Sequence, residues 1–185
     1  MKKILFLFFA FITLSAKAQK AEMVGNAMCY TEVVGFDGLA QNDIFVKALV
    51  ALSEYEGVNA NSSSKIDVCD KESGTIVYKG KVYNGFYKQN FMAGWHVYVD
   101  YILIIECKDG KARFRFMAPT LTYCWTAETS GPHTFPINQI YPTYTAETDY
   151  KIEKASKQLA QYLPACCETF VKAVIDLTKS YSSDF

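Results

Sequence analysis

The residues of this chain that could carry out nucleophilic or metal chemistry are two histidines, His96 and His133, and six cysteines. A Cys–His nucleophile needs an imidazole beside a thiol of lowered pKa, and nothing in the spacing of these residues predicts such a pair. The sequence also lacks the short paired spacings of zinc sites, the Gly-x-Ser-x-Gly turn of hydrolases and the glycine-rich loops that bind phosphates. It therefore predicts no metal site, no cofactor and no catalytic residue.

Aromatic side chains are abundant, at 15% of the chain, and they gather in residues 78–101 and 123–150. Aromatic rings combine a large apolar area with polar tips, which suits contacts with proteins or glycans, although such residues also serve as ordinary strand and core residues. If the protein has a partner, we expect the binding surface to lie on one sheet face and the loop that follows it. The candidate binding residues are Tyr98, Ile102, Ile104, Arg113, Arg115 and Trp125.

Most of these candidates lie on a predicted β-hairpin, in which strands at 95–108 and 111–118 flank Asp109-Gly110. This dipeptide favours a two-residue turn with both central residues at positive φ, and such a turn sets the register of the two strands. On the face toward the core, Ile105 should lie beside Phe114 and Leu103 beside Phe116, together with Cys107 and Ala112. On the other face, Glu106 should lie beside Arg113 and Ile104 beside Arg115.

The remaining segments predict further strands and two helical regions. Strands are expected at 29–36, 65–69 and 75–87, the last broken or bent near Gly80 and Gly85. One helix is expected at 44–56, capped by Asn42 or Asp43, and a helical segment at 149–180, capped by Asp149, with a kink or a new start at Pro164. The apolar side of that segment includes Ile152, Ala155, Leu159 and Leu163. Residues 119–148 contain four prolines and predict a long Pro/Thr/Tyr-rich loop. The order β-α-β-β-β-β-α predicts a single α+β domain over residues 29–185, a curved antiparallel sheet with helices on one face.

Residues 1–18 have the layout of a secretory signal peptide, with two lysines after Met1, an apolar run at 4–14 and small residues at 16 and 18. The apolar run is shorter than the roughly 20 residues of a membrane-spanning helix, so cleavage is expected rather than anchoring. We therefore expect an exported protein, periplasmic or extracellular, that is not membrane-spanning after cleavage. Residues 19–28 are expected to form a flexible tail.

The leader also changes the charge balance. The whole chain has 19 basic and 19 acidic residues, but three of the basic ones lie in the leader, so 16 remain against 19 acidic residues. Arg113 and Arg115 are the only arginines. Nucleic-acid binding calls for clustered positive charge, so the sequence predicts no nucleic-acid partner.

All six cysteines follow the leader, and an even number of cysteines in an exported chain permits disulfides. The chain is also long enough to fold without them, with buried thiols acting as small apolar side chains. The sequence leaves both alternatives open. The possible disulfide cysteines are Cys29, Cys69, Cys107, Cys124, Cys166 and Cys167.

Three segments resemble the DUF4468 family, a domain of unknown function with a TBP-like fold that occurs in exported proteins of Bacteroides-type bacteria. They are EVVGFDGLAQNDIFVKALVAL at 32–52, DKESGTIVYKG at 70–80 and YILIIECKDGKARFRF at 101–116. The resemblance covers about residues 30–118. It implies the TBP-like fold and export, and it implies no catalytic residues.

These observations favour a non-enzymatic exported binding module for a protein or cell-envelope component. One alternative is an envelope hydrolase with a pocket under loop 119–148, which would place His133 or a carboxylate beside a Cys or Ser in a cleft. Another alternative is a structural or oligomeric envelope protein.

Overall fold

The computed structural model describes residues 20–58, 65–88, 93–126, 131–142 and 150–181. The predicted signal peptide lies outside the described residues. The elements are β1 (Glu22–Val24), β2 (Ala27–Gly35), α1 (Gln41–Val58), β3 (Lys65–Asp70), β4 (Thr75–Lys88), β5 (Gly94–Lys108), β6 (Lys111–Trp125), β7 (His133–Pro136), a 3-10 helix (Ile137–Gln139), α2 (Tyr150–Ala160) and α3 (Leu163–Ser180).

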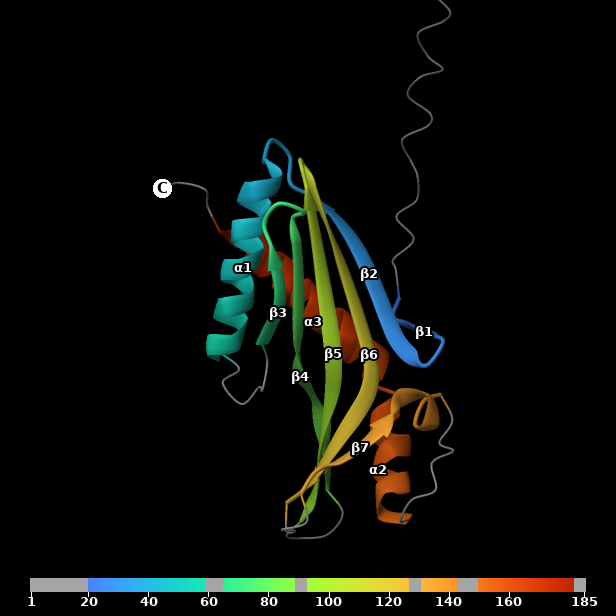
Figure 1. Ribbon diagram of the computed structural model, residues 1–185. Coiled ribbons are helices and arrows are strands. Elements are labelled where there is room, and N and C mark those ends of the chain that lie inside the picture. Colours follow the sequence, from blue (N-terminus) through green and yellow to red (C-terminus); the bar gives the residue numbers. More distant parts are fainter. Residues whose placement is uncertain (1–19, 59–64, 89–92, 127–130, 143–149, 182–185) are drawn as a thin grey trace, which may run out of the picture.

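The strands form one antiparallel sheet in the order β1-β2-β6-β5-β4-β3, with β7 pairing along β6 beyond the end of β2. Figure 1 shows α3 crossing behind the curved strands β4, β5 and β6, with α1 and α2 toward opposite ends of the same layer. The described helices thus cover one face of the sheet. The predicted α+β architecture is confirmed, and the described residues form seven strands where five were expected.

The core lies between this helix layer and the sheet, and aromatic rings make much of the contact. Phe170 of α3 packs against Tyr101 of β5 at a centroid distance of 4.4 Å and against Phe116 of β6 at 5.6 Å. Tyr55 of α1 meets the same ring edge-on at 5.1 Å. Because Phe170 joins α1 and α3 to the two central strands, it holds the helix layer on the sheet.

The register of the β5–β6 hairpin agrees with the prediction. Ile105 pairs with Phe114, Leu103 with Phe116, Glu106 with Arg113, Ile104 with Arg115 and Cys107 with Ala112. The turn itself differs from the prediction, because Gly110 has a positive φ of 72° whereas Asp109 does not. Contacts with the chain between β2 and α1 hold this turn: the Gly110 amide donates to the carbonyl of Leu39, and its carbonyl accepts from the amide of Phe36.

The same turn determines where α1 begins. The prediction placed a cap at Asn42 or Asp43, but the helix starts at Gln41. The Gln41 amide donates to the carboxylate of Asp109 at 2.8 Å, so an acceptor from a distant turn serves the first turn of the helix. A capping contact across 68 residues has no local sequence signal.

The flexible tail predicted for residues 19–28 is wrong for residues 22–28. Residues 22–24 form β1, which turns at Gly25, with φ of 61°, and pairs with the start of β2. Met28 is fully buried, so this segment closes the edge of the core. The Ala21 amide also donates to Glu168 of α3, which ties the segment to the helix layer.

The long loop predicted for residues 119–148 is also wrong in part. β6 continues through Pro119 to Trp125, and residues 133–136 form β7. Pro119 is tolerated because it lies where β6 changes partner, between the last pair with β2 at Ala118 and the first pair with β7 at Thr120. A missing amide costs little at such a junction. The described strands of this segment extend the sheet in its plane, and the 3-10 helix that follows, with its C-cap residue, packs Ile137 and Ile140 into the core.

The C-terminal helical segment consists of two helices, α2 and α3, and α3 begins at Leu163, next to Pro164. Of the two predicted alternatives, a kink or a new start, the new start is confirmed. Proline suits the first turn of a helix, because its missing N–H would have no partner there. The predicted apolar stripe is confirmed at Ile152, Ala155 and Leu159 of α2, which are buried. The expected cap at Asp149 lies outside the described residues.

Candidate functional site

The face of the sheet that points away from the helices is here called the open face. Five of the six predicted binding residues project from it, because the alternate residues of β5 and β6 are buried on the helix side. Tyr98, Ile102, Ile104 and Arg115 are half-buried, and Arg113 is exposed.

Trp125 does not join them. Its ring packs against that of its register partner Trp95 at 4.8 Å, and Trp95 is buried on the helix side. The cause is an irregularity in the pairing between Asp100 and Ile102, opposite residues 117–120 of β6. One extra residue on β6 reverses the alternation of its side chains. The odd-numbered residues of β6 point to the open face before this extra residue, and to the helices after it.

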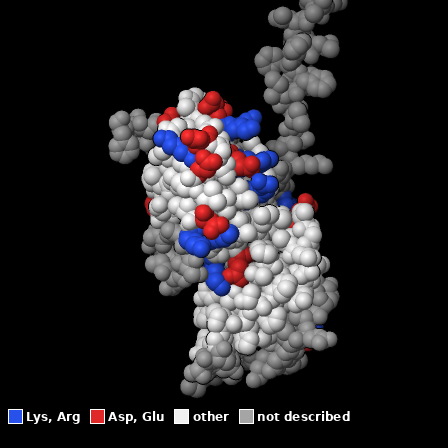
Figure 2. Space-filling view, in the orientation of Figure 1, with Lys and Arg blue, Asp and Glu red and all other residues white. Residues whose placement is uncertain are grey.

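Charged side chains near the β5–β6 turn are paired with one another. Glu106 receives two hydrogen bonds of 2.7 Å from Arg113 and one of 3.3 Å from Arg115, and Asp67 pairs with Lys79 at 2.7 Å. The hydrogen bonds from Arg113, aided by the charge of Arg115, hold the pKa of Glu106 below its ordinary value. In Figure 2 charged side chains gather on the upper part of this face, where Figure 1 shows the β5–β6 turn, and the described surface below them shows few charges.

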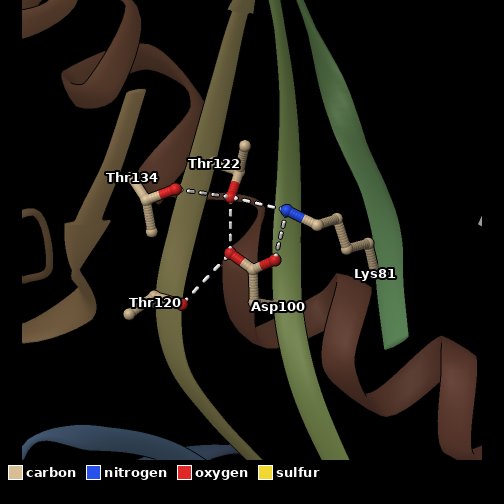
Figure 3. A network of polar contacts seen from close by, with 5 residues as sticks. All are labelled: Lys81, Asp100, Thr120, Thr122 and Thr134. Atoms are coloured by element: carbon tan, nitrogen blue, oxygen red, sulfur yellow. Dashed lines mark hydrogen bonds and ion pairs between the residues drawn. The ribbon is translucent and has the colours of Figure 1, made fainter. Parts of the chain in front are cut away.

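A polar network spans four strands near the middle of the open face (Figure 3). Asp100 of β5 pairs with Lys81 of β4 at 2.8 Å and accepts hydrogen bonds from Thr120 at 3.1 Å and Thr122 at 2.6 Å, both on β6. Lys81 also donates to the Thr122 hydroxyl at 3.0 Å, and Thr134 of β7 lies 3.1 Å from the same oxygen. We call these five residues the polar network.

Four ring-bearing residues lie beside this network and form what we call the aromatic patch: Tyr83, Phe86, His96 and Tyr98. Ring centroids are 5.6 Å apart for Tyr83 and Tyr98, 5.9 Å for Tyr83 and His96, and 4.8 Å for Phe86 and His96. Tyr83 is 50% exposed and Phe86 41%. The pKa of the Tyr83 phenol is raised, mainly because the phenol is partly buried and also because Tyr98 lies beside it. The phenol therefore stays neutral.

The patch depends on two irregular positions. The pairing of β4 with β5 shifts between Tyr83 and Gly85, so that Tyr83 opposes Tyr98 and Phe86 opposes His96. Gly94 supplies the space that the Phe86 ring fills, since a Cβ there would lie 2.5 Å from the ring. Sequence reasoning assigned the aromatics of β4 to no face, because the one-residue shift at Asn84 cannot be read from the alternation.

A hollow of about 260 Å³ opens on the sheet at the edge of the polar network. Its lining includes Lys65, Lys79, Lys81 and Asp100, with Ile102 and Pro119 as apolar walls. Among the described residues, no Ser, Cys or His lines it. The groups that converge there can donate and accept hydrogen bonds, but they do not include the nucleophile and base that a covalent mechanism would require.

The two histidines are separated by the sheet. His96 belongs to the aromatic patch, whereas the His133 ring lies 6.1 Å from Trp95 on the helix side. Within the described ranges, no three His, Cys, Asp or Glu side chains come together as a metal ion would require. Of the described helices, none combines the length and apolar character needed to cross a membrane.

All six cysteines are free thiols in the structure. Cys107 and Cys167 are buried, Cys69 is exposed, and the others are half-buried. Burial raises the pKa of Cys107 and of Cys166 to about 11, which disfavours the reactive thiolate. Cys107 and Cys166 therefore lack the lowered pKa of a catalytic cysteine.

Comparisons with known proteins agree with this architecture. Among curated proteins, none matches the chain. A TBP-like protein from Parabacteroides distasonis has a similar structure, with a TM-score of 0.64 and 16% identity over 88% of this chain and 99% of that one. A DUF4468 family protein from Bacteroides ovatus is similar with a TM-score of 0.62 and 15% identity, over 89% and 94% of the two chains. Residues 30–121 match the family described as a domain of unknown function (DUF4468) with TBP-like fold, and the chain therefore carries a domain of the DUF4468 family.

Proposed function

We propose that this protein is a non-enzymatic binding module, exported to the periplasm or beyond, that holds a protein or cell-envelope component on the open face of its sheet. The observation that carries the proposal is the exposure of the aromatic patch. Tyr83 and Phe86 leave about half of their surface uncovered on a face over which no described helix packs. Exposed aromatic clusters on a rigid sheet are typical of recognition surfaces.

The charges of the open face favour such a partner over a nucleic acid. Arg113 and Arg115 share Glu106, Lys79 pairs with Asp67, and Lys81 pairs with Asp100. A phosphate backbone would have to compete with carboxylates that already hold these cations. The predicted leader at residues 1–18 supports export, which would keep the protein away from DNA and RNA in the cell.

A crosslinking experiment in the native organism tests the proposal. A photo-crosslinking phenylalanine analogue replaces Tyr98 on the open face, and a matched variant carries it in place of Lys172, an exposed residue of α3 in the helix layer. We expect a reproducible adduct from position 98 only, and we expect the additional change Ile102→Ser to weaken it. No adduct at position 98, or the same adducts at both positions, would overturn the proposal.

A further inference from the structure

We infer that the aromatic patch and the polar network together form a binding site for a neutral oligosaccharide. This inference rests on the proposed function, since it names the ligand of the open face. Sugars present apolar C–H groups on the faces of their rings and hydroxyl groups around the edges. The open face offers the complement of both within one small region, with exposed rings on one side and hydrogen-bonding groups on the other.

The aromatic patch supplies the apolar part of the site. Its four rings succeed one another at centroid distances of 4.8 to 5.9 Å, comparable to the length of one pyranose unit. Adjacent rings are tilted by 40° to 56°, so they form a curved surface rather than one flat plane. Such a surface can contact successive sugar units of a chain, each through C–H groups against a ring face.

The polar network supplies the hydrogen bonds, and counting its donors and acceptors shows unused capacity. The Lys81 ammonium has three donors and uses two, for Asp100 and Thr122. The Asp100 carboxylate has about four acceptor positions and uses three, for Lys81, Thr120 and Thr122. Both side chains are partly open to solvent, at 36% for Lys81 and 20% for Asp100. Two neighbouring sugar hydroxyls can fill both positions, one donating to Asp100 and the other accepting from Lys81.

The hollow beside the network fits the end of such a chain. Its volume of about 260 Å³ is slightly below the roughly 300 Å³ at which small-molecule pockets begin, which suits one sugar unit. Lys81 and Asp100 line it together with the apolar walls of Ile102 and Pro119. A chain can therefore place one unit in the hollow and lay the following units across Tyr98 and Tyr83.

Charge indicates that the ligand is neutral. The patch contains no Lys, Arg, Asp or Glu. At the hollow, Asp100 offsets the charge of Lys81 at 2.8 Å and Asp67 offsets that of Lys79 at 2.7 Å, while Lys65 is exposed to solvent. An anionic glycan would lose its solvation opposite Asp100, and a cationic ligand would meet Lys81. An uncharged chain pays neither penalty.

Two histidines on opposite sides of the sheet allow a direct test by NMR. The protein is titrated with maltohexaose, cellohexaose, xylohexaose, laminarihexaose and tetra-N-acetylchitotetraose, and the imidazole signals are recorded. We expect at least one oligosaccharide to shift the His96 signals in a saturable way while the His133 signals stay in place. His133 is the internal control because its ring lies against Trp95 on the helix side.

Matched variants locate the effect. Tyr83→Ala removes an exposed ring from the patch, and Tyr162→Ala removes a ring of similar exposure, 52%, from the junction of α2 and α3. We expect Tyr83→Ala to weaken binding about tenfold and Tyr162→Ala to leave it unchanged. Equal effects of the two variants, or shifts at both histidines, would overturn the inference.

The result also separates this inference from the proposed function. If none of the five oligosaccharides moves the His96 signals at millimolar concentration while position 98 still crosslinks to a protein, the glycan is excluded and the binding role stands. If position 98 crosslinks to nothing as well, both fail.

Discussion

Asp100 is the residue on which the polar network depends, and its removal has a calculable cost. Replacing it with alanine takes away the carboxylate that joins β4, β5 and β6 across the open face. Two threonine hydroxyls lose an ionised acceptor, at 3.1 Å and 2.6 Å, and Lys81 loses its ion-pair partner. The backbone pairing of the three strands is not altered, so the change in stability reports on the side chains.

The magnitude follows from the exposure of each partner. Hydrogen bonds to a charged group contribute about 1.5 kcal/mol each at the lower end of the usual range, and an ion pair with a lysine that is more than a third exposed adds about 0.5 kcal/mol. Part of this loss is recovered, because Lys81 reaches water and keeps Thr122, while Thr122 keeps Thr134. We therefore expect Asp100→Ala to lower the free energy of unfolding by about 2 to 3 kcal/mol and Asp100→Asn by about half as much.

Urea unfolding of the purified protein at neutral pH and fixed ionic strength measures these changes. Asp67→Ala is the matched control, since it removes a carboxylate that also pairs with a lysine but is more exposed, at 34% against 20% for Asp100. That control should leave the midpoint nearly unchanged. If Asp100→Ala costs no more than Asp67→Ala, the network does not stabilise the sheet and the reasoning from its burial is refuted.

Two further substitutions and one labelling experiment test other parts of the structure. The hydrogen bond from Arg113 lowers the pKa of Glu106 in the folded state, so Glu106 stabilises the fold at neutral pH and this stabilisation is lost as the pH falls through that pKa. In the Glu106→Gln variant, the free energy of unfolding should therefore fall less between about pH 5 and about pH 3 than in the unchanged protein. Iodoacetamide should label the exposed Cys69 in the native protein and reach Cys107, whose burial raises its pKa to about 11, only after unfolding, as read by mass spectrometry; equal labelling would contradict the burial. Gly74→Ala would place a Cβ 2.6 Å from the Cys107 carbonyl oxygen, at a residue whose φ is 69°. We expect it to lower the free energy of unfolding by about 1 to 3 kcal/mol, which urea unfolding measures.

The parts of the fold that could be predicted are those with local signals. Asp109-Gly110 connects two strands whose apolar and polar residues alternate, and a turn this short sets their register. The turn alone therefore predicted the neighbouring residues of the two strands, such as Glu106 beside Arg113 and Leu103 beside Phe116. The α+β class followed in the same way from apolar spacing, and the new start at Pro164 from the position that proline prefers in a helix.

The parts that could not be predicted depend on irregular pairing or on distant contacts. One extra residue in β6 between Met117 and Thr120 turns Trp125 from the open face to the helix side, and a shift at Asn84 gives the aromatics of β4 their partners on β5. Gly85 and Pro119 stand at these two positions, and both residue types indicate irregular pairing, but neither tells by how many residues the register shifts. As a result the candidate site was predicted along β5, the first half of β6 and Trp125, and Tyr83 and Phe86 were missed.

The open face explains why a TBP-like fold need not carry a TBP-like activity. A sheet that grips nucleic acid needs cations whose charge is available to phosphates and apolar wedges that enter between bases. On this sheet Glu106 already occupies both arginines, and the exposed rings lie at the other end, beside a lysine held by Asp100. The rings and the free hydrogen-bonding positions, rather than net charge, are what this face offers a ligand. A shared fold supplies the curved sheet, and the side chains on its open face decide what the sheet can hold.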